Sequence, residues 1–166
     1  MTQARERWGA PLTGLLALGL LAVTSGSTAS AGAMLDASTI LQQSPTAIRA
    51  FLGQPVRTRA VAPGDFQLPD GGTSRAYDGR GVRIDIDFEA ERSTTAVIAF
   101  PDAALAPRTY EAALEAVNLP PGPRPDLVRH DSREWHNLEG YFVRVIAAYP
   151  ALDRIDAIIL SVHPLP

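Results

Sequence analysis

The sequence contains no cysteine and no lysine. Without cysteine the chain has no disulfide, no thiolate metal ligand and no catalytic thiol, so its stability must come from its hydrophobic core. All 15 basic residues are arginine, and with 18 acidic residues the formal net charge is −3. The arginines are dispersed, whereas nucleic-acid binding normally requires clustered positive charge. The composition therefore predicts no nucleic-acid partner.

Sequence motifs of several enzyme classes are also missing. The chain has no G-x-S-x-G, no phosphate-binding G-x-x-x-x-G-K-[ST] and no H-E-x-x-H. A dispersed Ser–His–Asp triad stays open, because such triads are recognised by geometry and not by sequence order. The sequence leans towards a non-catalytic protein, and it predicts neither a cofactor nor a metal site.

The first 33 residues have the layout of a secretory signal peptide. Two arginines precede the apolar run Pro11–Val23, and small residues follow. The run is about 13 residues long, shorter than the roughly 20 that a membrane-spanning helix needs. We expect cleavage after Ala31 or Ala33, with a retained anchor as the alternative. No Arg-Arg pair precedes the run, so we expect the general secretory route and a periplasmic or extracellular destination.

Cleavage after Ala33 would leave 133 of the 166 residues, with thirteen arginines against seventeen acidic residues. This length suffices for one modest domain or two very small units that share a core. The absence of cysteine excludes a lipid anchor at the cleavage site. The oligomeric state and any partner are not specified by these features.

The first half of the remaining chain contains signals for one helix and three strands. Ser44 and Pro45 can begin a helix over 45–52, with an upstream extension through Ile40 and Leu41 as an alternative. Gly53 can end it. The predicted strands are an edge strand over 56–61, the strictly alternating Val82–Glu89, and its antiparallel neighbour Thr94–Phe100.

The second half contains comparable signals. Thr109 can cap a helix whose apolar stripe runs to Val117, and a proline-rich stretch over 118–125 ends it. Strands are predicted over Tyr141–Tyr149 and Ile155–Val162. The predicted fold class is α+β, with two short helices packed on a mainly antiparallel sheet.

The two halves match as a duplicated α-β-β(-β) unit, over 34–104 and 105–166, in one compact domain. The alternative is that two ordinary amphipathic segments look alike by chance. At an offset of about 60 residues, the matching residues are Tyr77, Gly81, Val82-Arg83-Ile84 and Glu91-Arg92 against Trp135, Gly140, Val143-Arg144-Val145 and Asp153-Arg154.

The stretch Ser44–Pro55, with Thr46, Ile48 and Leu52-Gly53-x-Pro55, resembles the helix ending of small outer-membrane assembly lipoproteins of the BamE/SmpA type. The tandem arrangement also resembles the β-lactamase inhibitor protein. These resemblances imply helices on one face of an antiparallel sheet, and binding through an exposed sheet surface or through loops. The chain departs from the lipoproteins because it has no lipid-bearing cysteine.

Four side chains form the local concentration of metal-competent groups: His130, Asp131, Glu134 and His136. Zinc sites use three or four such ligands. On a straight strand, however, the two histidines would lie roughly 20 Å apart. The favoured interpretation is therefore that these are solvated loop or edge residues. The alternative function is a small exported hydrolase that uses them, with or without a metal ion.

Three carboxylates, Asp85, Asp87 and Glu89, share one face of the predicted strand, at spacings of about 7 Å. An EF-hand loop would need a central glycine and a distal glutamate, which are absent. Paired carboxylates for glycoside hydrolysis would need a cleft beside them. We interpret this strip as a solvated face.

The corresponding face of the second half is much less polar, because the repeat places Ile146 and Ala148 at the positions of Asp85 and Asp87. Aromatic, arginine and aliphatic side chains together are typical of binding hot spots. The sequence therefore predicts a partner-binding face at Phe142, Arg144, Ile146 and Trp135. The alternatives are that another element covers this face, and that Trp135 itself lies in or next to the core. We expect an exported, soluble, non-catalytic binding or accessory protein of the bacterial cell envelope.

Overall fold

The computed structural model describes residues 33–64, 68, 70–79 and 81–165. The predicted signal peptide, residues 1–33, lies outside this part of the chain except for Ala33. Among the described residues, no helix has both the length and the apolar character to cross a membrane.

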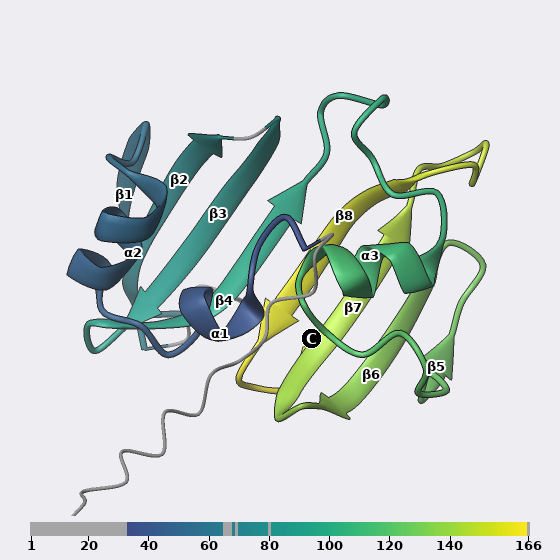
Figure 1. The fold of residues 1–166 in the computed structure, drawn as a ribbon. Coiled ribbons are helices and arrows are strands. Elements are labelled where there is room, and N and C mark those ends of the chain that lie inside the picture. The colour runs from purple at the N-terminus through teal and green to yellow at the C-terminus, as the bar shows by residue number, and fades with distance from the viewer. Residues whose placement is uncertain (1–32, 65–67, 69, 80, 166) are drawn as a thin grey trace, which may run out of the picture.

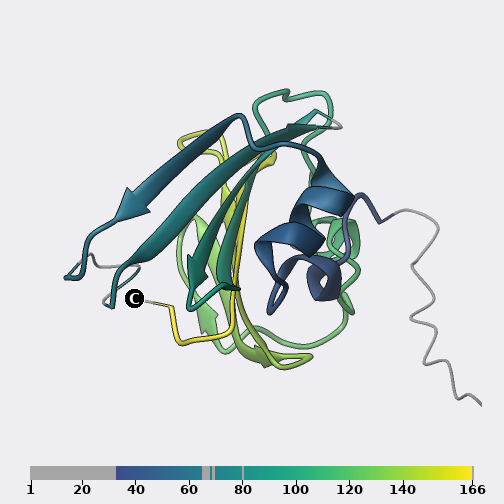
Figure 2. The same ribbon diagram turned by 90° about the vertical axis from the view of Figure 1, so that its left-hand side faces the viewer.

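In the part of the chain that the structure describes, eight antiparallel strands form a single sheet, and three short helices lie on one of its faces (Figures 1 and 2). The strand order is β1-β2-β3-β4-β8-β7-β6-β5. This confirms the predicted α+β class, with one helix more than expected. In chain order the elements are α1 (Ala37–Ile40), α2 (Pro45–Leu52), β1 (Arg57–Val61), β2 (Gly72–Gly79), β3 (Val82–Glu89), β4 (Arg92–Ala99), α3 (Tyr110–Ala116), β5 (Leu127–Val128), β6 (Ser132–Leu138), β7 (Tyr141–Ala147) and β8 (Ile155–Ser161).

The sheet consists of two four-stranded halves that meet at β4 and β8. The first half is two helices followed by four strands, and the second half is one helix followed by four strands. Each half runs from an outer strand to a central one. Val97 lies opposite Ile159 at the centre of this junction. The internal repeat stays a prediction. The strand order is the same in both halves when it is followed outwards from β4 and from β8, which is a pseudo-twofold arrangement.

Helix starts were predicted from capping residues, and the structure confirms both of the expected helices. The Ser44 hydroxyl accepts a hydrogen bond from the Ala47 amide at 3.2 Å, and the Thr109 hydroxyl accepts one from Ala112 at 3.1 Å. The alternative extension of α2 through Ile40 and Leu41 is wrong. Ile40 ends the separate helix α1, because the chain turns at Gln42, where φ is 60°.

The strand predictions for β1, β3, β4, β7 and β8 are confirmed within a residue or two at their ends. The strands β2, β5 and β6 were not predicted from the sequence. The β2 sequence contains two glycines and shows little alternation, and β5 has only two residues. Pairing with a neighbouring strand can hold such segments in place where local propensity is weak.

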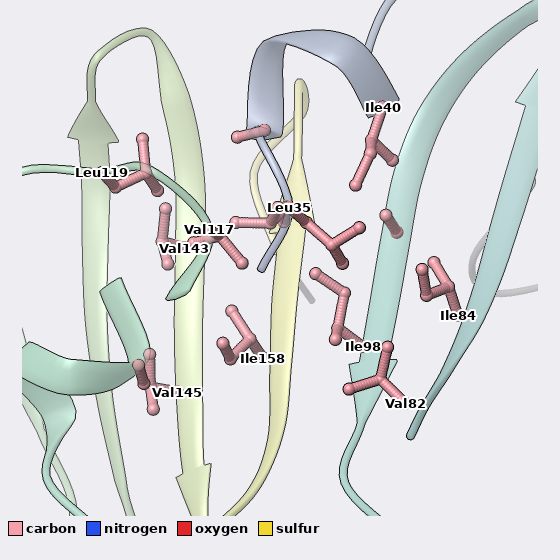
Figure 3. Packing of buried hydrophobic residues seen from close by; sticks show 14 of the residues in the cluster. Leu35, Ile40, Val82, Ile84, Ile98, Val117, Leu119, Val143, Val145 and Ile158 are labelled. Atoms are coloured by element: carbon pink, nitrogen blue, oxygen red, sulfur yellow. The ribbon is translucent and has the colours of Figure 1, made fainter. Parts of the chain in front are cut away.

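The hydrophobic core lies between the helices and the sheet and is shared by both halves. Figure 3 shows Leu35 among residues from both halves, including Val117, Ile98 and Ile158. The segment before α1 is fixed to the end of α3 by backbone hydrogen bonds, such as Met34 N–H to Ala116 O at 2.9 Å. Residues near the start of the described chain therefore stabilise the second half.

Candidate functional site

The face of the sheet opposite the helices carries the candidate site. No described helix lies over this outer face (Figure 2). Phe142, Arg144 and Ile146 project from β7 to it, because the alternate residues Val143 and Val145 belong to the core. All three are half-buried by neighbouring side chains. The structure brings these three predicted site residues together.

Trp135, the fourth predicted member, lies on the other face. Its cross-strand partner is the core residue Val143, and it is only 5% exposed. The indole Nε1 donates a hydrogen bond to the Pro123 carbonyl at 2.9 Å, which satisfies its buried polar atom. Trp135 therefore packs in the core beneath β6. Of the four predicted site residues, Phe142, Arg144 and Ile146 lie on the outer face.

The buried carboxylate of Glu134 lies beside Arg144 in the second half of the outer face and contacts two arginines. Glu134 lies opposite Arg144, and its side chain is only 7% exposed. Its Oε1 accepts a hydrogen bond from Arg144 Nε at 3.0 Å and forms an ion pair with Arg129 Nε at 3.3 Å. Sequence reasoning missed Arg129, because it precedes β6 and approaches Glu134 only once the β5–β6 turn has formed.

A small pocket of about 110 Å³ lies next to this ion pair. Its lining includes Glu134, His136 and Phe142, together with Pro164 and Leu165 from the C-terminal segment. His136 Nε2 lies 3.9 Å from Glu134 Oε2, and the His136 and Phe142 ring centroids are 6.1 Å apart. The pocket combines one carboxylate with aromatic and aliphatic walls.

The first half of the outer face carries a comparable but more exposed ion pair. Asp85 Oδ1 lies 3.5 Å from Arg57 Nη2, and Asp85 Oδ2 lies 3.4 Å from Arg83 Nε. Ala76 lies between Arg57 and Asp85 in the sheet, and its small side chain lets the two charged groups meet. The predicted solvated strip is thus partly neutralised by arginines.

The remaining two carboxylates of the strip differ from each other. Asp87 is only 7% exposed, so it is not part of a solvated face. Glu89 Oε2 lies 3.8 Å from His163 Nε2.

The sheet register corrects the expected correspondence between the halves. Gly79 pairs with Val82 and Leu138 pairs with Tyr141, so the two hairpins turn in the same way. Counted from these turns, Asp85 corresponds to Arg144 and not to Ile146. One row of cross-strand neighbours contains both: Arg57, Ala76, Asp85, Val97, Ile159, Arg144, Glu134 and Leu127.

The four residues of the hydrolase hypothesis do not form one cluster. His130 lies in the turn between β5 and β6, with its ring centroid 6.5 Å from that of Tyr149. The Asp131 carbonyl accepts a backbone hydrogen bond from Ala147 at 2.7 Å. In the described part of the chain, no three His, Asp or Glu side chains are close enough together to hold a metal ion.

Three titratable groups near the helix face have perturbed pKa values. Burial raises the pKa of Tyr77 above 10.0, and the nearby Arg75 offsets part of this rise. The pKa of Tyr141 is also raised above 10.0, by burial and by the negative charge of Asp36. For Asp36, burial acts upwards, but hydrogen bonds from Ser38 and Asn118 outweigh it and lower its pKa below 3.8.

Comparison of the sequence with protein-family models and with curated proteins finds no match. Two solved structures resemble the fold. An extracellular protein containing an SCP domain from Bacillus anthracis has a TM-score of 0.50 and 11% identity, over 77% of this chain and 46% of that chain. A cysteine-rich secretory protein from Staphylococcus aureus has a TM-score of 0.49 and 9% identity, over 78% and 47%. The chain spans a little under half the length of either protein, and the likeness concerns the fold alone.

Proposed function

We propose that this protein is an exported, non-catalytic binding or accessory protein of the bacterial cell envelope. Its export is inferred from the signal-peptide layout of residues 1–33. The absence of common catalytic motifs supports a binding function over catalysis. The resemblance to the β-lactamase inhibitor protein and to BamE/SmpA-type lipoproteins is part of this proposal, since it implies binding through a sheet surface or loops.

The observation that carries the proposal is the open outer face around Phe142, Arg144 and Ile146. The three helices among the described residues lie against the opposite face, and the outer face has an aromatic, an arginine and an aliphatic side chain in one neighbourhood. Such combinations are enriched in the energetically important part of protein interfaces. The Glu134–Arg144 ion pair holds the arginine in place, which lowers the entropy that binding would cost.

Site-specific crosslinking tests whether this face meets a partner. A photo-crosslinking amino acid would replace Ile146 in the full chain, expressed in a bacterium that exports it. The matched control carries the same amino acid in place of Thr46, which is exposed on the helix side. We expect a discrete adduct from position 146 and none from position 46, and mass spectrometry would identify the partner.

Alanine substitutions then test the named residues. We expect Phe142→Ala and Arg144→Ala to reduce the yield of the adduct, whereas Phe51→Ala, an exposed aromatic residue on α2, should leave it unchanged. Thermal unfolding of each purified variant separates loss of binding from loss of structure. An undiminished adduct from folded Phe142→Ala and Arg144→Ala variants would overturn the assignment of this face.

A further inference from the structure

The two edges of the sheet differ in length and in chemistry. At one edge, β5 has only two residues, and the neighbouring β6 is interrupted by a register shift between Trp135 and Leu138. At the other edge, β1 pairs with β2 over five residues in unbroken register. The first four residues of β1 are all exposed. An edge strand of this kind leaves backbone N–H and C=O groups directed away from the sheet, where another strand can bind them.

The side chains of β1 alternate between two chemical characters. Arg57 and Arg59 lie on the outer face, in the same rows as Asp85 and Asp87. Arg59 makes no ion pair within the described residues, and the Arg57 side chain remains 65% exposed although it contacts Asp85. On the helix side, Thr58 and Ala60 are small. A strand added here would therefore place every second side chain beside an arginine and the others beside small residues.

We propose that β1 is a docking edge for an extended acidic segment of another polypeptide. The added strand would bind through backbone hydrogen bonds, with carboxylates next to Arg57 and Arg59 and small or β-branched side chains next to Thr58 and Ala60. Opposite charges on neighbouring strands stabilise their pairing, and like charges destabilise it. This edge is separate from the face around Phe142, so the inference does not depend on the function proposed above.

A second copy of this chain fits the edge poorly. In an antiparallel pair of β1 strands centred on Arg59, each Arg59 would lie opposite the other, and Arg57 would face a region that also lacks an acidic residue. Charged residues on an edge strand are a common way of preventing such self-association. The same two arginines that disfavour self-pairing favour an acidic strand.

Peptide binding tests this proposal with the purified chain. The probe is a labelled seven-residue peptide that alternates glutamate and valine, and the comparison peptide has lysine in place of glutamate. Fluorescence anisotropy measures binding, and hydrogen exchange of the β1 amides reports its location. We expect the acidic peptide to bind, to weaken as salt is added, and to slow exchange over Arg57–Val61.

Charge reversal provides the decisive comparison. The double variant Arg57→Glu/Arg59→Glu should bind the acidic peptide roughly tenfold more weakly or worse, and should prefer the lysine peptide. The matched control Arg124→Glu changes an exposed arginine near the opposite edge and should bind like the unmodified chain. Equal binding of both peptides, no protection of β1, or an equal effect of Arg124→Glu would overturn the proposal. So would concentration-dependent dimerisation that the peptide does not compete with and that slows exchange at β1.

Discussion

The two halves of the sheet carry ion pairs in the same cross-strand row, but they bury them to different extents. In the first half, the Arg57, Arg83 and Asp85 side chains are 65%, 44% and 34% exposed. In the second half, Glu134 is 7% exposed and Arg144 is 19% exposed. Asp85 on β3 reaches Arg57 of the exposed edge strand β1 across Ala76 of β2, whereas Glu134 contacts Arg129 of the β5–β6 turn and lines a pocket with Pro164 and Leu165 of the C-terminal segment. The same strand topology thus holds a solvent-screened ion pair in the first half of the sheet and a buried ion pair in the second half.

The largest expected loss of stability comes from substitutions at the central junction between β4 and β8, because both halves of the sheet pack there. Ile98 and Ile158 are cross-strand partners on β4 and β8, and they are 1% and 0% exposed. We expect Ile158→Ala to lower the free energy of unfolding by about 4 kcal/mol, because it leaves a cavity in a core that both halves share. Ile98→Ala should cost a similar amount.

Chemical denaturation followed by tryptophan fluorescence and by far-ultraviolet circular dichroism measures both variants. Because the core is continuous across the junction, the two probes should give one coincident transition. Two separate transitions would show that the halves unfold independently, and the shared core would then not be the source of their stability.

Neutralising one carboxylate in each half tests the difference in burial directly. Glu134→Gln removes the charge that two arginines contact, and we expect a loss on the order of 3 kcal/mol. Asp85→Asn, the matched change in the first half, should cost less than about 1 kcal/mol, because its partners are solvent-screened. Urea denaturation at neutral pH gives both values, and equal losses would contradict the assigned difference.

The two hairpin glycines offer a smaller comparison. Gly81 and Gly140 both have positive φ, at 77° and 88°. A methyl group at Gly140 would meet no atom within 4 Å, whereas one at Gly81 would overlap the Leu105 side chain. We expect Gly140→Ala to cost about 1 kcal/mol from backbone strain alone, and Gly81→Ala somewhat more, about 2 kcal/mol, because Leu105 must move. Thermal unfolding of the two variants should rank them in this order.

The smallest expected effect concerns the segment that joins the first half to the second. Asp36 accepts hydrogen bonds from Ser38 N–H at 2.9 Å and from Asn118 Nδ2 at 2.9 Å. Asn can also act as an N-cap, so Asp36→Asn should cost less than about 1 kcal/mol near pH 6.

The pH dependence of the stability of Asp36→Asn shows whether the charge of Asp36 stabilises the fold. Because the pKa of Asp36 is lowered below 3.8 in the folded protein, its charge adds stability above pH 3.8, and this contribution is lost as the pH falls through the lower folded value. The stability difference between the unmodified chain and Asp36→Asn should therefore shrink between pH 5 and pH 2. A constant difference over that range would mean that the Asp36 charge is not the stabilising group.

The fold class and most elements follow from local patterns. The alternation in Val82–Glu89 was sufficient to predict β3, and Ser44 and Thr109 were sufficient to begin two helices. The candidate face was partly predicted. The alternation that puts Val143 and Val145 in the core also puts Phe142, Arg144 and Ile146 on the opposite face. For Trp135 two interpretations were open, the β7 face and the core, and strand pairing places the residue in the core opposite Val143.

The ion-pair partners of the charged residues could not be predicted from the local sequence. Arg129 and Glu134 are close in sequence, yet their ion pair depends on the tight turn before β6, and Arg144 arrives on a different strand. Glu134 was considered as a metal-competent residue of a hydrolase, with a solvated loop or edge position as the favoured interpretation, because a sequence does not show which of its neighbours will neutralise a carboxylate. Burial decides between these roles, and burial depends on the pairing of distant strands.

The sequence by itself determined that this chain forms short helices and amphipathic strands, without disulfides, around a core of aliphatic residues. Those properties depend on side-chain periodicity and capping, which act over a few residues. The tertiary structure alone decided that β4 and β8 join the two halves of the sheet, and that Glu134 is buried while Asp85 is not. These outcomes depend on strand order, which is set by contacts between residues far apart in the chain.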